Sequence, residues 1–266
     1  MKKFMALVIV ALVGSANAYG ADMPTPYAKA PAMAPAYSWS GWYAGVNVGA
    51  AWSKDGTTWN ANPAAYGVAF TPVLNAAGTG TINKSGATVG GQIGFNYQFS
   101  PMWLAGLEAD IGYTDLSKAR TTVVPPPGVL GTFVTSTFES KWLATVRGRV
   151  GIIAAPSLLL YGTGGVAFAD VKTSDFAFFA ADGSINAASS KTTRTGWTAG
   201  GGAEWQFSAN WSAKVEYLYV DLGRVNYTSP NTFTPAATIN HDHRVTENLL
   251  RVGFNYRFGG PVVARY

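Results

Sequence analysis

The last segment of the chain alternates between apolar and polar positions. From Leu250 to Phe258 every second residue is apolar, and the residues between them are polar or glycine. A period of two is typical of a β-strand with two unlike faces, because successive side chains point to opposite sides. One face is large and apolar, whereas the other carries two arginines and an asparagine.

The same alternation recurs along the chain and predicts eight strands with connections that alternate in length. Short periplasmic turns that alternate with long extracellular loops are the topology of outer-membrane barrels. The predicted strands are Trp42–Trp52, Gly86–Phe99, Trp103–Tyr113, Lys141–Ile152, Leu158–Asp170, Thr195–Phe207, Trp211–Asp221 and Val245–Phe258. The predicted long loops are Ser53–Ser85, Asp115–Ser140, Thr173–Lys191 and Gly223–Asp242.

The charged residues of these strands test which face meets lipid. If the apolar phase faces outward, nine charges of the strand interiors fall on the inward phase: Glu108, Asp110, Arg147, Arg149, Glu204, Lys214, Glu216, Arg251 and Arg257. A lysine or arginine on the lipid face near mid-bilayer costs about 2–4 kcal/mol, so this distribution favours a membrane barrel. Only Asp170 and Asp221 break the phase, at the loop ends, where water is expected.

We interpret the nine inward charges as a structural core of ion pairs, because an eight-stranded barrel is just wide enough for its own side chains. Buried charges need partners. The fifth strand alternates least, since it opens with three leucines, and we place Leu160, Val166 and Phe168 outward.

Aromatic spacing agrees with a membrane-spanning height. Three pairs lie ten positions apart, namely Trp42 with Trp52, Trp103 with Tyr113, and Trp197 with Phe207. Ten residues at about 3.3 Å each and a tilt of roughly 40° span about 25 Å, the height of the apolar band. Each pair would place one ring at each membrane interface.

The start of the chain has the features of a secretory signal peptide, which we assign to residues 1–18. Lys2 and Lys3 precede the apolar stretch Phe4–Val13, and Ala16–Ala18 forms a small-residue cleavage site. That stretch is too short for a spanning helix, which needs roughly 20 residues. We expect an Ala/Pro-rich periplasmic lead-in over 19–38, the barrel over 39–258, and a C-terminal tail over 259–266.

Composition narrows the possible functions. The chain has no cysteine, which excludes disulfides, thiolate metal sites and thiol nucleophiles. Its formal charge of +5 becomes 5 − 2 = +3 once Lys2 and Lys3 are removed, and charged residues make up only 12%. Without a basic run, we expect no nucleic-acid partner. The 31 glycines and 14% aromatic residues favour all-β structure.

Glycine motifs in the chain are interpreted as packing features. Gly162–Gly165 and Gly200–Gly202 resemble phosphate loops, but neither has the Gly-Lys-Ser/Thr ending or a following helix. Gly86, Gly90 and Gly94 share the inward phase, where small residues make room for the charged side chains of a narrow interior.

His241 and His243 flank Asp242 and form the only histidine cluster, which we place on the last long loop. Such a cluster could bind a metal or haem, or form part of a hydrolase site. Because no third ligand and no serine-containing motif is recognisable, we prefer a polar loop tip. We therefore predict no catalytic residue, metal site or cofactor.

Three segments carry a resemblance to a known family: Ser40–Gly45, Gly162–Ala167 and Arg251–Phe258. With the signal and the Ala/Pro-rich lead-in, the chain resembles small alphaproteobacterial outer-membrane proteins. These surface antigens and haemin-binding proteins have an eight-stranded barrel like the transmembrane domain of OmpA. The resemblance implies roles in envelope integrity and surface contact, sometimes with weak porin or haemin-binding activity. Either Phe258 or Tyr266 could serve as the terminal signal for barrel assembly.

The sequence thus predicts an all-β, eight-stranded, antiparallel up-and-down transmembrane β-barrel in the outer membrane. We expect a structural, non-enzymatic protein that supports the envelope and displays surface loops. The alternatives are a narrow passive porin, and a receptor or adhesin that binds haem or host ligands through its loops. Expected partners are outer-membrane lipids, lipopolysaccharide and the barrel-assembly machinery.

Overall fold

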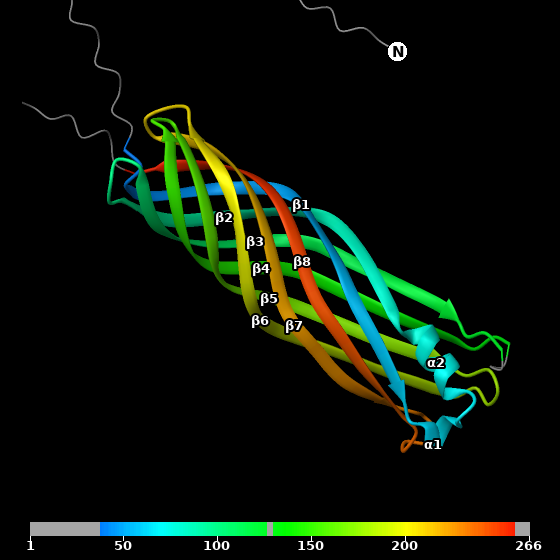
Figure 1. The fold of residues 1–266 in the computed structure, drawn as a ribbon. Helices are drawn as coiled ribbons and strands as arrows, with labels where there is room; N and C mark the ends of the chain where they lie inside the picture. Colours follow the sequence, from blue (N-terminus) through cyan, green and yellow to red (C-terminus); the bar gives the residue numbers. More distant parts are fainter. Residues whose placement is uncertain (1–37, 127–129, 259–266) are drawn as a thin grey trace, which may run out of the picture. The chain divides into compact units, whose positions relative to one another are not determined.

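The computed structural model describes residues 38–126 and 130–258, which form a closed β-barrel (Figure 1). Each strand pairs antiparallel with the next, and β1 pairs with β8 to close the ring. The strands are β1 (Gly41–Ala61), β2 (Gly80–Gln98), β3 (Trp103–Val123), β4 (Phe133–Ala155), β5 (Leu158–Phe178), β6 (Ile185–Gln206), β7 (Trp211–Pro230) and β8 (Thr238–Arg257). The predicted fold class is confirmed. The signal peptide (1–18), nearly all of the lead-in and the tail (259–266) lie outside the described residues.

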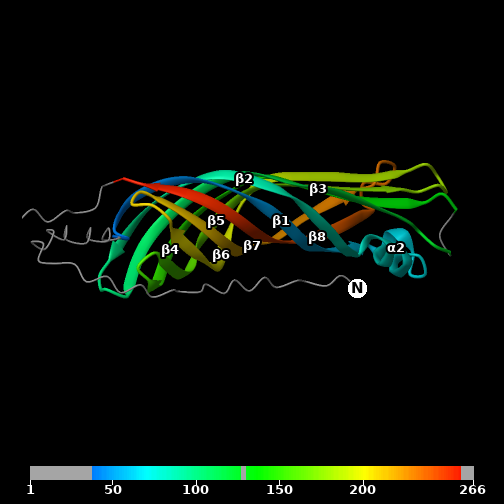
Figure 2. The same ribbon diagram turned by 90° about the horizontal axis from the view of Figure 1, so that it is seen from above.

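Two short helices, α1 (Pro63–Tyr66) and α2 (Thr71–Gly78), connect β1 to β2. They lie at the end of the barrel opposite the tight turns, as both views show (Figures 1 and 2). Within the described part of the chain, no helix is long and apolar enough to cross a membrane.

The predicted long loops are wrong in extent, because much of each is strand. The connections at that end are residues 62–79, 124–132, 179–184 and 231–237. Three tight turns at the opposite end, between β2 and β3, β4 and β5, and β6 and β7, are as predicted. The strands continue well beyond the length that a bilayer requires, which is about 9–11 residues.

The inside and outside faces follow the predicted phase. The rings of all three aromatic pairs are exposed on the outer surface, and Leu160 and Val166 also face outward. All nine predicted interior charges are buried, with exposed fractions of at most 6%. Phe168 is half-buried on the same outward face as Val166.

The outer surface changes character part-way along each strand. On β1 the outward residues are apolar from Trp42 to Trp52 and then become Lys54, Gly56, Thr58 and Asn60. In each aromatic pair, the ring farther from the tight turns is called the upper aromatic residue, namely Trp52, Tyr113 and Trp197. We call the part of the barrel beyond these rings the extension, which on β1 is Ser53–Ala61 and on β8 Thr238–Glu247. The remainder, the membrane part, presents the apolar surface. A polar outer face explains why the extension does not show the lipid-facing pattern in the sequence.

Candidate functional site

The inside of the barrel gathers most of the buried charges, and Arg147 lies at the centre of the membrane part. Its guanidinium donates to Glu108 Oε1 at 2.5 Å, Asp110 Oδ2 at 2.8 Å and Glu216 Oε1 at 3.0 Å. Strand register produces this meeting in part, because Glu108 lies directly opposite Arg147 across β3 and β4. Each carboxylate is also held by a second cation, so the group forms one connected network.

Three further cations complete this network. Arg251 donates to Asp110 Oδ1 at 2.9 Å and to Glu216 Oε2 at 2.5 Å. The Lys214 ammonium lies 2.9 Å from both oxygens of Glu108, and Arg149 donates to Glu204 Oε2 at 2.8 Å. The predicted pairing of interior charges is thus present, and close contacts of this kind offset the large cost of removing charge from water.

Two tyrosines belong to the network and were not singled out from the sequence. The Tyr43 hydroxyl donates to Glu108 Oε2 at 2.7 Å and accepts from Arg149 Nη1 at 2.9 Å. The Tyr161 hydroxyl donates to Glu216 at 3.0 Å. Gly94 makes room for Tyr43, because a Cβ at that position would lie 2.3 Å from its hydroxyl oxygen. The run of inward glycines was the available signal.

Trp39 and Arg257 occupy the barrel next to the tight turns. The Trp39 indole is buried, donates to the carbonyl of Pro156 at 3.2 Å, and lies under the Arg257 guanidinium at 5.0 Å. Arg257 also donates to Gln206 at 3.1 Å. Trp39 precedes the first strand and was not predicted to contribute to the interior.

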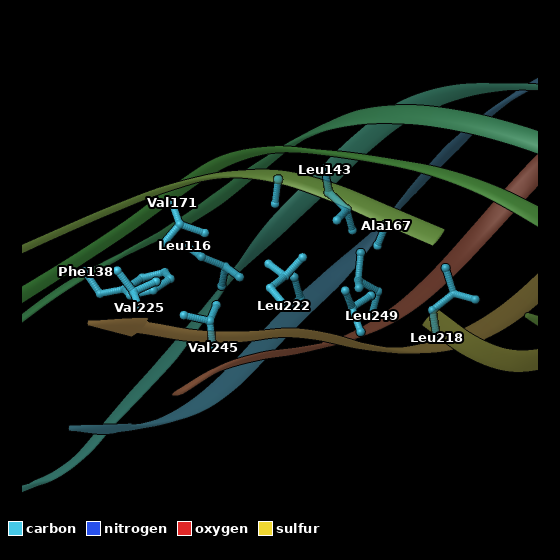
Figure 3. Close-up of a cluster of buried hydrophobic side chains, with 13 residues drawn as sticks. Leu116, Phe138, Leu143, Ala167, Val171, Leu218, Leu222, Val225, Val245 and Leu249 are labelled. Carbon is cyan, nitrogen blue, oxygen red and sulfur yellow. The ribbon is translucent and has the colours of Figure 1, made fainter. Parts of the chain in front are cut away.

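Above the charge network, the interior becomes apolar. Figure 3 shows these side chains gathered in the space that the strands enclose. The apolar cluster comprises Ala51, Leu116, Phe138, Leu143, Ala167, Ala169, Val171, Leu218, Val220, Leu222, Val225, Val245 and Leu249. Its members come from six strands, so it crosses the whole barrel. A packed apolar layer has no polar groups to hold a chain of water molecules.

The histidines lie inside the extension and not at a loop tip, which corrects our prediction. His241 and His243 are on β8, and strand alternation turns both inward while Asp242 faces outward beside Arg224. The histidines meet Asp175 of β5, whose Oδ2 lies 2.6 Å from His243 Nε2 and 3.2 Å from His241 Nδ1.

Neighbouring hydroxyl groups complete this histidine cluster. Tyr227 donates to Asp175 Oδ2 at 2.6 Å, and the Ser229 hydroxyl lies 2.8 Å from His241 Nε2. Within residues 38–126 and 130–258, no three histidine or acidic side chains are arranged to hold a metal ion. The cluster is a set of buried polar contacts in which every ring packs against another, with Tyr227 stacked on His243.

Burial sets the protonation of this cluster, which lies beyond the membrane part. Burial lowers the pKa of His241 to about 4, against the opposing attraction of Asp175, so its imidazole is neutral at pH 7. Burial alone would raise the pKa of Asp175, but the hydrogen bond and charge of His243 hold it below its ordinary value. Burial also raises the pKa of Tyr227, and Asp175 adds to that shift.

Lys84 and Asp55 form a second buried ion pair in the extension. The Lys84 ammonium also lies over the Phe138 ring, a cation–π contact at the edge of the apolar cluster. Both residues fall inside the predicted first loop, and the residues around them lack the alternation that predicts a strand.

Helix α2 covers the far end of the extension. Pro72 lies in its first turn, where the missing N–H costs no hydrogen bond, and Leu74 and Ala77 are buried against Trp59. Gly78 allows this approach, because a Cβ there would lie 2.1 Å from the Trp59 ring. The glycine motifs at Gly162–Gly165 and Gly200–Gly202 lie within the paired strands β5 and β6 and not in loops before a helix.

Comparison with known proteins identifies the family of this barrel. A model of the outer membrane protein beta-barrel domain family matches residues 24–258. The chain belongs to this family. It is 33% identical over 262 residues to the 31 kDa outer-membrane immunogenic protein of Brucella melitensis, covering 96% of this chain and 100% of that protein. It is 28% identical over 264 residues to the 25 kDa outer-membrane immunogenic protein of Brucella abortus, covering 97% and 100%.

As a member of the outer membrane protein beta-barrel domain family, the protein is located in the cell outer membrane. Among solved structures, it is similar to the outer membrane protein OprG of Pseudomonas aeruginosa, with 14% identity, a TM-score of 0.43, and coverage of 85% of this chain and all of that one. The resemblance drawn from the sequence is therefore confirmed at the level of the family.

Proposed function

We propose that this chain is a structural outer-membrane protein that strengthens the envelope and displays its extension and four connections at the cell surface. The observation that carries this proposal is the filled interior. Trp39, the charge network, the apolar cluster, the histidine cluster and α2 follow one another along the barrel axis. No residue is given a catalytic role in this proposal.

The filled interior argues against the passive-porin alternative. The charged side chains at its centre are nearly all satisfied by one another, with Arg147 and Arg251 each contacting two or more carboxylates. A water path through this layer would require those contacts to separate, which leaves buried charges unpaired at a cost of several kcal/mol.

Conductance of purified, refolded protein in planar bilayers tests the proposal. We expect little or no steady conductance and no uptake of sugar-sized solutes in liposome swelling. The companion variant Leu222→Gly, which removes a buried side chain from the apolar cluster, should leak more than the unmodified protein. Large, stable, salt-proportional conductance of the unmodified protein would contradict the structural role and support the porin alternative.

One observation favours a surface binder as a second candidate. Phe133, Phe176 and Phe178 face outward near the far end of the extension. The ring centroid of Phe133 lies 5.8 Å from that of Phe176 and 5.6 Å from that of Phe178. Apolar rings gathered on a largely polar outer surface are typical of contact sites. Replacing all three with serine should abolish binding of the protein to haem or to host cells if they form such a site, and unchanged binding would remove this candidate.

The proposed partners follow from the surfaces. Outer-membrane lipids and lipopolysaccharide would contact the apolar surface and the base of the extension. The barrel-assembly machinery would act during insertion of the chain.

A further inference from the structure

Five charged side chains line one hollow on the outer face of the extension, across β4, β5 and β6. The hollow has a volume of about 170 Å³, and its lining is Glu139, Lys141, Asp170, Lys172 and Lys191. Three ammonium groups therefore meet two carboxylates. We call this group the lysine pocket.

The ammonium groups of the lysine pocket are only loosely paired. Lys172 Nζ lies 3.7 Å from Glu139, and Lys191 Nζ lies 3.8 Å from Asp170, both beyond hydrogen-bond distance. Among the described residues, no carboxylate lies within 4.0 Å of the Lys141 ammonium. The side chains of Lys172 and Lys191 are 46% and 71% exposed, so their donors are open to an external acceptor.

The strand register also places two lysines of the pocket side by side, where their positive charges repel each other. Lys172 lies directly opposite Lys191 across β5 and β6, and like charges directly opposite destabilise a sheet. A comparable pair, Arg224 opposite Arg244, lies across β7 and β8.

That arginine pair is neutralised within the protein. Arg244 lies 3.0 Å from Asp221, and Arg224 lies 3.4 Å from Asp242, so two cations meet two anions. The lysine pocket retains one positive charge in excess. An anion from outside the chain would balance that excess charge and screen the repulsion between Lys172 and Lys191.

The height of the lysine pocket identifies the source of such an anion. Lys141 directly precedes Trp142, and Asp170 follows Phe168 by two positions on the same outward face. Trp142 lies directly opposite Tyr113, and Phe168 is the next outward residue after Val166, which lies opposite Trp197. Both rings therefore lie level with the upper aromatic residues, which mark the interface between the apolar lipid core and the headgroups. The lysine ammonium groups thus lie at the level of the outer-leaflet headgroups, where basic side chains attract anionic lipid.

We propose that Lys141, Lys172 and Lys191 bind a phosphate group of a phosphorylated outer-leaflet glycolipid. The three ammonium groups donate to the phosphate oxygens, while Glu139 and Asp170 hold Lys172 and Lys191 in position. This inference rests on the outer-membrane role proposed above and names the site of its lipid contact. It does not depend on the filled interior.

Titration of the refolded protein with bisphosphorylated lipid A, followed by native mass spectrometry, tests this site. The pocket variant carries Lys141→Gln, Lys172→Gln and Lys191→Gln. The matched control carries Lys54→Gln, Arg224→Gln and Arg244→Gln, which also removes three positive charges from the outer surface but leaves the lysine pocket intact. We expect the pocket variant to bind lipid A at least about tenfold more weakly, and the control to change by less than about threefold.

Equal weakening in both variants would show that only net charge matters and would overturn the proposal, as would unchanged binding in the pocket variant. If the triple variant does not refold, Lys141→Gln alone takes its place, because Lys141 is exposed and its ammonium has no acidic partner among the described residues. Its expected effect is a weakening of about threefold.

Two additional probes identify the source of the phosphate. Dephosphorylated lipid A with the same acyl chains should bind the unmodified protein about tenfold more weakly. Inorganic phosphate should compete only at concentrations far above those of the lipid, and equal competition would indicate a free-anion site instead. Because planar-bilayer conductance reports on the interior alone, failure of this site and failure of the structural role remain distinguishable.

Discussion

The membrane part and the extension are built from the same eight strands, but their outer faces have opposite polarity. In the membrane part, the outer residues are apolar, as at Val48, and the interior holds ions such as Arg147. In the extension, the outer residues are polar, as at Thr58, and the interior mixes apolar side chains such as Phe138 with buried polar groups such as Asp55. The residue types on the outer face of each part therefore match the solvent around it, which is lipid for the membrane part and water for the extension.

The comparison also explains how the extension can be stable without lipid. Leu222, Val225 and Phe138 form a core of the kind found in soluble proteins, where burial of each large apolar side chain contributes about 1.5–3 kcal/mol. The membrane part gains its stability from lipid contact outside and from ion pairs inside. Substitutions on each side of the boundary should therefore have unlike effects.

The largest expected effect comes from breaking the charge network. Arg147→Ala leaves Glu108, Asp110 and Glu216 without their shared partner, and removal of one member of a buried pair costs about 3–5 kcal/mol. When samples are heated to increasing temperatures before gel electrophoresis, the temperature at which the band of the folded protein disappears should fall sharply. Arg224→Ala, at an exposed ion pair of the extension, is the control and should cost less than about 1 kcal/mol. Similar costs for both variants would contradict the network.

The next effect compares inside with outside at neighbouring positions. Leu249 belongs to the apolar cluster, whereas Leu250 faces lipid. Leu249→Ala should leave a cavity and cost about 2–5 kcal/mol in equilibrium unfolding. Leu250→Ala should cost less, because lipid chains close around the shorter side chain. The reverse ranking would show that the two faces are misassigned.

A charge on the outer face should distinguish the two parts of β1. Val48→Arg places a guanidinium in lipid and should cost about 2–4 kcal/mol if the position lies near mid-bilayer. Thr58→Arg, on the same face of the extension, should be almost neutral because its side chain is in water. Folding yield into vesicles and urea unfolding measure both. An equally harmful Thr58→Arg would place the extension in the membrane.

The smallest expected effect is a pH dependence that belongs to the extension. His241 has a folded pKa of about 4 and an unfolded pKa near its ordinary value of about 6.5. Its unfolded form therefore binds a proton first, so stability is complete above about pH 6.5 and declines as pH falls toward 4. Between pH 7 and pH 5 the loss should be about 1–2 kcal/mol.

The variant His241→Gln isolates this contribution, because it keeps a polar side chain beside Ser229 but cannot take up the proton. Its unfolding free energy should vary less between pH 7 and pH 5 than that of the unmodified protein. A variant with the same pH slope as the unmodified protein would assign the dependence to other groups.

The sequence predicted the membrane part well because two solvents act on its strands. Lipid outside and ions inside gave β8 strict alternation, from which Arg251 and Arg257 were placed inward correctly. In the extension, water outside and a mixed interior remove that contrast. Asp55 and Lys84 therefore resembled ordinary loop charges, although they form a buried pair.

Single residues outside the strand pattern were the hardest to predict. Trp39 precedes β1, and nothing local shows that its indole will fold back beneath Arg257. The histidines were recognised as a cluster, but their partner Asp175 lies on β5, and only the closed ring brings the two strands across the barrel from each other. Helix α2 is rich in small residues and has no strong helical period in sequence, so its role as a cover over Trp59 was not foreseen.

The position of the solvent boundary along β1 tests the comparison most directly. The chain has no cysteine, so single cysteines at Val46, Val48, Lys54 and Thr58 can each carry a spin label without a background. In vesicles, we predict that labels at Val46 and Val48 are relaxed mainly by oxygen, and that labels at Lys54 and Thr58 are relaxed mainly by a water-soluble nickel complex. The change should occur around Trp52. Oxygen-dominated relaxation as far as Thr58 would contradict the division of the barrel into a membrane part and an aqueous extension.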